Sequence, residues 1–131
     1  MIALLIALAA VSDCHAAARR SGLDYRQCLG RVDQLADSEM AQQWPITLAA
    51  LRGEDRENRR ENANKPDLAQ GLLESQRAWL RYRAAECSMV ASQAAGGTAY
   101  GELGSECSIT LTRQRTELLR RRVSGVVRYL R

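Results

Sequence analysis

Residues 68–95 read LAQGLLESQRAWLRYRAAECSMVASQAA and contain the clearest helical pattern in the chain. Asn64 or Asp67 is placed to cap the first turn of such a helix. Gly96-Gly97 is expected to end it, because glycine tolerates positive φ. The pattern produces a wide apolar face, as expected for a helix that packs against two partners. Two stripes at helical steps make up this face, namely Leu72, Trp79, Tyr82, Glu86 and Met89 beside Leu73, Leu80, Cys87, Ala91 and Ala94.

A second helix is expected on the N-terminal side, beginning near Leu23 or Asp24. Pro45 is expected to kink or break it, since proline lacks an N–H and disfavours helix at the preceding residue. A short helical stretch over residues 46–51 then ends near Gly53. The inner face of this helix consists of Leu29, Val32, Ala36 and Met40, which follow one another at helical spacing.

The charged segment 53–65, GEDRENRRENANK, has no apolar face. It is either a solvated helix extension or a linker. Its carboxylates, such as Glu54 and Asp55, are expected to stay solvated and therefore untuned for acid–base chemistry.

Residues 107–130 predict a third helix on the C-terminal side. No alternating run is long enough for a strand, so the sequence predicts an all-α, three-helix, up-down-up antiparallel bundle with disulfides. The inward seam of the third helix consists of Ile109, Thr112, Thr116, Leu119, Val123, Val126 and Leu130. Its outer face is expected to carry Arg113, Arg115, Arg120, Arg121, Arg122 and Arg128, and a solvated role is favoured over binding an anionic polymer or lipid.

The four cysteines suit an oxidising compartment and allow three pairings. Cys14–Cys28 with Cys87–Cys107 is preferred, because both bridges close short loops. The second bridge would tie two helices together and contribute roughly 3 kcal/mol to a domain of this size.

The first eleven residues form an apolar run too short to span a membrane. The run is typical of a signal peptide, with cleavage after Ser12 and a mature domain of residues 13–131. A cut before Arg19 is the second possibility and would leave three cysteines. No basic residue precedes the run, so a packed N-terminal helix is the alternative. A periplasmic or secreted protein is expected.

Enzyme chemistry has little support in this sequence of 131 residues with a net charge of +4. His15 is the only histidine, so a Ser/His/Asp or Cys/His arrangement is difficult to build. The cysteines form no CxxC and do not have metal-site spacing. We therefore expect no catalytic residues, metal or cofactor, and export argues against a nucleic-acid partner.

Two groups of residues are candidates for binding. A glycine-rich segment, residues 96–106, is expected to be a tethered loop, and such loops commonly carry binding; a plain helix–helix connection is the alternative. Its candidate contacts are Gly96, Gly97, Thr98, Tyr100, Glu102, Leu103 and Glu106. The second group is a motif of Gln76, Arg77, Trp79, Tyr82, Arg83 and Glu86. A structural role is favoured for this motif over a role as a recognition patch. In that role Trp79 and Tyr82 anchor the core, and Arg83 and Glu86 form a pair that reaches neighbouring helices.

Several motifs together resemble the LprI-like lysozyme inhibitor family of small exported bacterial proteins. The most specific is SQRAWLRYRAAEC over residues 75–87, which is similar to the family's AQRAWxxYRDAEC. The other matches are Asp13-Cys14, Cys28, Ala36-Asp37, Gly96-Gly97-Thr98, Cys107 and LTRQRTEL at residues 111–118. Ala84 stands where the family has aspartate, and the region around Trp44-Pro45 departs from the family's Asn-rich stretch.

The resemblance implies an all-helical, disulfide-linked domain outside the cytoplasm, and inhibition of lysozyme or a related muramidase. Under this hypothesis the segment 96–106, or a neighbouring arginine, enters the cleft of the enzyme. Vertebrate lysozymes are generally basic and this chain is also net positive, so binding would need local acidic patches. The alternative is an envelope-associated structural domain that docks on anionic lipid or polymer through its arginine face.

Overall fold

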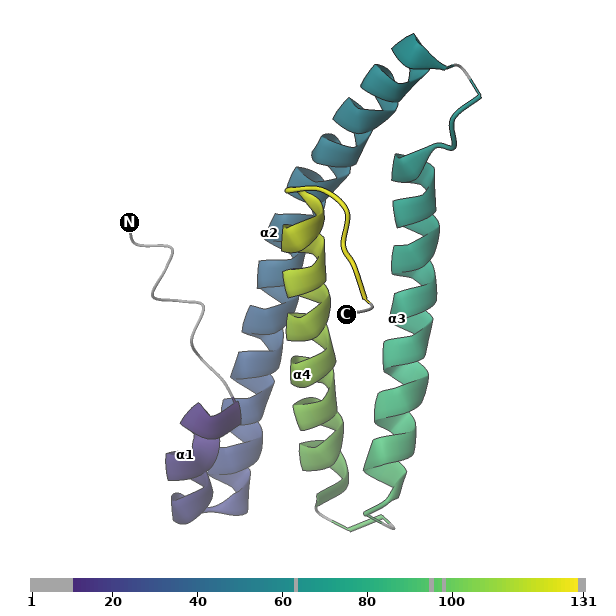
Figure 1. Ribbon diagram of the computed structural model, residues 1–131. Coiled ribbons are helices and arrows are strands. Elements are labelled where there is room, and N and C mark those ends of the chain that lie inside the picture. Colours follow the sequence, from purple (N-terminus) through teal and green to yellow (C-terminus); the bar gives the residue numbers. More distant parts are fainter. Residues whose placement is uncertain (1–10, 63, 95, 98, 130–131) are drawn as a thin grey trace, which may run out of the picture.

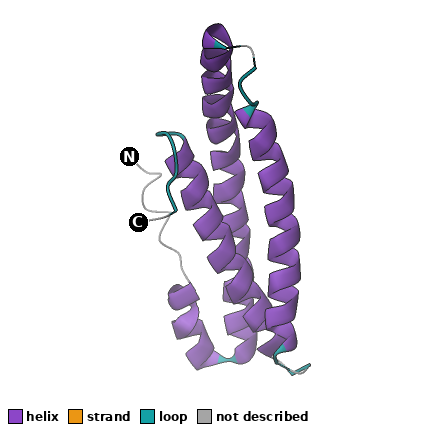
Figure 2. Cartoon of the chain, turned by 45° about the vertical axis from the view of Figure 1, so that its right-hand side comes forward, coloured by secondary structure: helices purple, strands orange, loops and turns teal. Residues whose placement is uncertain are grey.

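The computed structural model describes residues 11–62, 64–94, 96–97 and 99–129. A short 3-10 helix, η2 (Val11–Cys14), precedes four α-helices, namely α1 (His15–Arg20), α2 (Gly22–Glu61), α3 (Leu68–Ser92) and α4 (Ala99–Arg122). Figure 1 shows α3 running back alongside α2, α4 returning in the direction of α2, and α1 beside the first turns of α2. Figure 2 shows the described loops at the ends of these helices.

The all-α prediction is confirmed, since the described residues contain no strand. The predicted number of three helices is wrong, because η2 and an additional α-helix, α1, precede the three long helices. The predicted signal peptide falls mainly on residues 1–10, which lie outside the described residues. No helix in the described part of the chain is both long and apolar enough to cross a membrane.

Of the kink or break predicted at Pro45, the break is wrong, because α2 continues through the proline to Glu61. Proline removes one N–H from the helix, and Figure 1 shows α2 bending in its middle. Packing on both sides of the proline keeps the helix continuous. Met40 is buried before it, and Thr47 is fully buried after it and donates its hydroxyl to the Leu119 carbonyl at 2.8 Å. Residues 53–65 were expected to be either a helix extension or a linker. They continue α2 as far as Glu61.

The first turn of α3 is capped by two aspartates. Asp67 accepts a hydrogen bond from the Gln70 N–H at 3.0 Å, as predicted for an N-cap residue. Asp55 reaches across from α2 and accepts from the Leu68 and Ala69 N–H groups at 2.8 and 3.0 Å. Its exposed fraction is only 4%, so the expectation of a solvated Asp55 is wrong. This carboxylate satisfies donors that a helix leaves unpaired and ties the two helices together.

Replacing Asp55 by Asn should lower the free energy of unfolding by about 1–3 kcal/mol at pH 7. An amide can accept one of the two N–H bonds but presents its own NH2 to the other. Burial alone would raise the pKa of Asp55, but the Ala69 and Leu68 N–H groups, Asp67 and Arg59 lower it below its usual value. A lowered folded pKa means that this stabilisation is present above the unfolded value of about 3.9 and is lost as the pH falls through the folded value.

Urea unfolding at several pH values checks this expectation. The difference between wild type and Asp55→Asn should shrink below about pH 4. The neighbouring exposed carboxylate supplies a control, Glu54→Gln, which should change stability little. A pH-independent difference would contradict the assigned role of the carboxylate charge.

The core of the bundle consists of two apolar clusters separated by a polar layer. The first gathers Cys14, Leu29, Val32 and Ile109 near the Cys14–Cys28 bridge. The second gathers Met40, Leu72 and Leu119, with Trp44, Leu48, Leu51 and Trp79 packed around them. Between them on α4 lie Thr112, Arg115 and Thr116, all buried. The predicted inner face of α2 is confirmed, since Leu29, Val32, Ala36 and Met40 are all buried.

The bounds of α4 differ from the predicted third helix. It begins at Ala99 rather than Cys107 and ends at Arg122 rather than Leu130. Val123 and Val126 are therefore exposed, at 40% and 89%, instead of lying in the seam. The chain after α4 turns back alongside the last turns of that helix (Figure 1).

Candidate functional site

A groove of about 310 Å³ runs between α3 and α4 beside the Cys87–Cys107 disulfide. The disulfide covalently joins the two helices that form its walls. Both predicted bridges, Cys14–Cys28 and Cys87–Cys107, are present in the structure. The groove is lined by Tyr82, Glu86, Val90, Leu103, Glu106, Cys107, Thr110 and Leu111.

The groove combines members of both candidate groups from the sequence. Tyr82 and Glu86 come from the α3 motif, whereas Leu103 and Glu106 come from the predicted loop. The loop prediction itself is wrong, because Tyr100, Glu102, Leu103 and Glu106 all lie in the first two turns of α4. Gly96 and Gly97 are exposed in the short connection between the helices, and Gly96 has a φ of 78°. Thr98 lies outside the described residues.

Three carboxylates make this end of the molecule locally acidic, although the chain is net positive. Glu86 and Glu106 line the groove, and Glu102 lies one turn before Glu106 on α4. Glu102 forms an ion pair with Arg26 at 3.4 Å. Arg26 therefore compensates the charge of Glu102 rather than that of the two carboxylates in the groove. Glu106 accepts a hydrogen bond from the Tyr25 hydroxyl at 2.6 Å. Burial, this bond and the charges of Glu106 and Glu102 raise the pKa of Tyr25 to about 12, so the phenol remains a donor at neutral pH.

An apolar stripe on α3 adjoins the acidic groove. Tyr82 and Met89 are about half exposed, at 52% and 50%, and the small residues Ala78 and Ala85 are exposed on the same stripe at helical spacing. The sequence pattern predicted Tyr82 and Met89 to be buried, and this is wrong. The face of α3 that is buried carries Ala69, Leu72, Cys87 and Ala91 instead. Exposed apolar stripes of this kind mark interaction surfaces.

The remaining residues of the α3 motif form a scaffold between helices. Arg83 donates to Asp37 of α2 at 2.7 Å and to Thr112 of α4 at 2.8 Å. Gln76 accepts from the Nε of Arg115 at 2.9 Å. The guanidinium carbons of Arg83 and Arg115 lie 5.0 and 5.9 Å from the centroid of the half-buried Trp79 ring. Trp79 and Arg83 therefore lie between the helices, whereas Arg77 is exposed and Glu86 lines the groove.

The predicted arginine face of α4 is largely engaged within the molecule. Arg115 is 5% exposed and lies in the core, so its placement on the outer face is wrong. Arg113 lies 4.0 Å from Glu39, Arg120 pairs with Glu117, and Arg122 donates to the Tyr129 hydroxyl. A three-residue step from Ile109 through Thr112 to Arg115 is the sequence signal that could have placed Arg115 inside. Four of the six arginines therefore have partners in the described structure.

No group of three or more His, Cys, Asp or Glu side chains suited to a metal ion occurs among the described residues. The groove offers apolar contacts, a phenol and carboxylates beside a covalently braced helix pair. This arrangement suits protein recognition, in which a buried aromatic anchor is surrounded by polar groups.

Comparison with known proteins matches the chain to a family. The family model described as "Lysozyme inhibitor LprI" matches residues 14–119, which include both disulfides and both walls of the groove. An uncharacterized protein of Rhizobium meliloti (strain 1021) is 32% identical over 108 residues, covering 82% of this chain and 76% of that protein. No solved structure matches. The extent of the family match, from the first cysteine to the last buried leucine of α4, shows that this chain belongs to the LprI lysozyme inhibitor family.

Proposed function

We propose that this protein is an extracytoplasmic, non-catalytic inhibitor of lysozyme or a related muramidase. The observation that carries the proposal is the family match over residues 14–119. Two disulfides agree with folding in an oxidising compartment, where such enzymes act. Export, through the apolar segment at residues 1–12, is part of this proposal.

We further propose that the inhibitor contacts its target through the acidic groove and the neighbouring apolar stripe. Tyr82 and Met89 supply exposed apolar area, and Glu86 and Glu106 supply negative charge. A basic lysozyme would be repelled by the net charge of +4 at long range. The local carboxylates offset that repulsion where the surfaces meet, since complementary charge at an interface acts on association rate and register.

Inhibition in this arrangement results from occlusion. Muramidases cleave a glycosidic bond with two carboxyl groups in a cleft that must admit a polysaccharide. A stable protein interface buries about 1,200–2,000 Å² in total, and the groove with the stripe would form the centre of such an area. A bound inhibitor of this size excludes the polysaccharide without any covalent step.

Inhibition assays on oxidised residues 13–131, against several lysozymes at two salt concentrations, test the proposal. We expect inhibition that is lost when the protein is reduced, because reduction frees the α3 and α4 walls from each other. Salt screens both the long-range repulsion between two net-positive proteins and the local attraction of the carboxylates, so the two concentrations show which of the two dominates binding. A folded protein that inhibits none of the enzymes would overturn the proposal, and steep salt-dependent binding to acidic vesicles would then favour envelope docking instead.

A further inference from the structure

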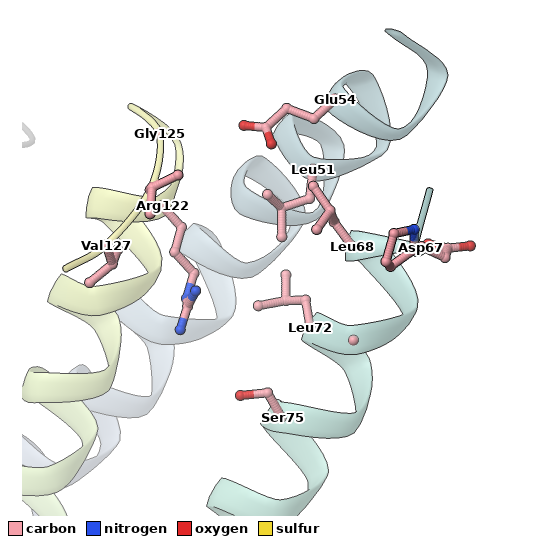
Figure 3. A pocket seen from close by; sticks show the side chains of 12 residues that line it. Leu51, Glu54, Asp67, Leu68, Leu72, Ser75, Arg122, Gly125 and Val127 are labelled. Carbon is pink, nitrogen blue, oxygen red and sulfur yellow. The ribbon is translucent and has the colours of Figure 1, made fainter. Parts of the chain in front are cut away.

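A cavity of about 460 Å³ lies at the other end of the α3–α4 pair from the acidic groove. It is bounded by α2, by the first turns of α3 and by the chain that follows α4 (Figure 3). Leu51, Leu68, Leu72 and Val127 give it apolar walls, and Ser75 and Arg122 are among its polar groups. Its volume falls in the range of small-molecule sites, at the smaller end.

Arg122 introduces an incompletely bonded guanidinium into this cavity. Figure 3 shows its side chain entering the space between α4 and α3. One terminal nitrogen donates to the Tyr129 hydroxyl at 3.0 Å. The Nε is buried and has no hydrogen-bond partner in the described structure. A buried donor without an acceptor is costly, and an acceptor supplied by a ligand would remove that cost.

A second guanidinium lies on the same side of α4. Arg115 is buried, and its hydrogen-bond acceptors within the described structure are neutral, namely Gln76 at 2.9 Å and the Ser75 hydroxyl at 3.0 Å. Ser75 also lines the cavity, so it links Arg115 to the space that Arg122 enters. Burial and the charge of Arg122 lower the pKa of Arg115, and Tyr129 offsets this in part.

Neither of these two cations has a carboxylate within ion-pair distance among the described residues. Two carboxylates do line the cavity region, but Asp67 pairs with Arg59 and caps α3, and Glu54 is exposed. Uncompensated positive charge beside apolar walls favours an anion that brings its own apolar part.

We propose that this cavity binds a single-chain anionic amphiphile, with its anionic head at Arg122 and Ser75 and its aliphatic chain along Leu51, Leu68 and Leu72. A carboxylate or phosphate head would accept from the free Nε in the fork geometry that arginine favours. The volume suits one aliphatic chain rather than the two chains of a phospholipid. This site is separate from the acidic groove, so its occupation does not depend on lysozyme inhibition.

Binding of laurate to the oxidised chain, followed by calorimetry, tests the proposal. Arg122→Gln should weaken laurate binding at least tenfold, whereas Arg121→Gln, a matched change at the adjacent exposed arginine, should leave it unchanged. Dodecyl phosphate in place of laurate shows which anionic head is preferred, and neutral dodecanol should bind at least tenfold more weakly than either. Absence of laurate binding, equal binding of dodecanol, or equal effects of the two arginine changes would overturn the proposal.

A cavity-filling variant keeps the test valid if Arg122→Gln is unstable. Gly71 lines the cavity on α3, and a Cβ added there meets nothing within 4 Å. Gly71→Leu should therefore fold at least as well as wild type, since leucine favours helix over glycine. It should also reduce laurate binding at least tenfold by occupying the space of the chain. Unchanged binding by a folded Gly71→Leu protein would show that the cavity is not the site.

Discussion

Replacing Cys87 and Cys107 together by alanine is expected to lower the free energy of unfolding by roughly 3 kcal/mol. The bridge spans a sequence separation of 20 residues, so its loss frees the unfolded chain to adopt many more conformations. For a chain of this length the melting temperature should fall by roughly 10 °C. Urea unfolding and thermal melting followed by circular dichroism measure both quantities.

The same two helices provide a control for the disulfide variant. Ser88 and Thr110 are exposed neighbours of the two cysteines, and Ser88→Ala with Thr110→Ala should change stability little. If the cysteine variant unfolded at the urea concentration of wild type, the bridge would not constrain the unfolded chain as expected. A lower free energy of unfolding in both double variants would instead indicate that these helices are sensitive to any substitution near the bridge.

Replacing Tyr82 by alanine should weaken lysozyme inhibition about 30-fold or more, the effect of a binding hot spot worth about 2 kcal/mol. Tyr82 is 52% exposed, so its removal leaves no core cavity and the free energy of unfolding should change by about 0.5 kcal/mol or less. The inhibition constant and urea unfolding of the same preparation separate the two effects. This expectation rests on the proposed function and on the groove as the contact surface.

Tyr100 supplies a matched control for the tyrosine test. It is 47% exposed and lies in the first turn of α4, but it does not line the groove. Tyr100→Ala should therefore keep inhibition near the wild-type level. The reverse result, with Tyr100→Ala defective and Tyr82→Ala active, would move the contact surface to the start of α4 and contradict the groove.

Much of the helical framework is determined by the sequence alone. The three- and four-residue spacing of Leu29, Val32, Ala36 and Met40 predicts the buried face of α2, because helical periodicity is a local property. The Asp67 cap and both disulfides were predictable for the same reason, since each depends on short-range spacing. The family signature at residues 75–87 is also readable directly, and it named the family that the comparison shows.

Contacts between distant parts of the chain decided the rest. Whether α2 continues past Pro45 depends on how the residues after the proline pack against α4. The hydrogen bond from the Thr47 hydroxyl to the Leu119 carbonyl is part of that packing. Asp55 receives its donors from 13 and 14 residues away, and Arg115 finds its acceptors 39 and 40 residues earlier in the chain. No local pattern records these partners.

The candidate site shows the same division between local and tertiary information. The sequence pointed to two separate groups, with Tyr82 and Glu86 in a motif expected to have a structural role, and Leu103 and Glu106 in an expected loop. Only the packing of α3 on α4 places them around one groove, because the rotation of each helix about its axis decides which side of an apolar pattern is covered. Residue spacing thus determined which segments are helical, and the packing of the helices against one another determined which side chains remain available to a partner.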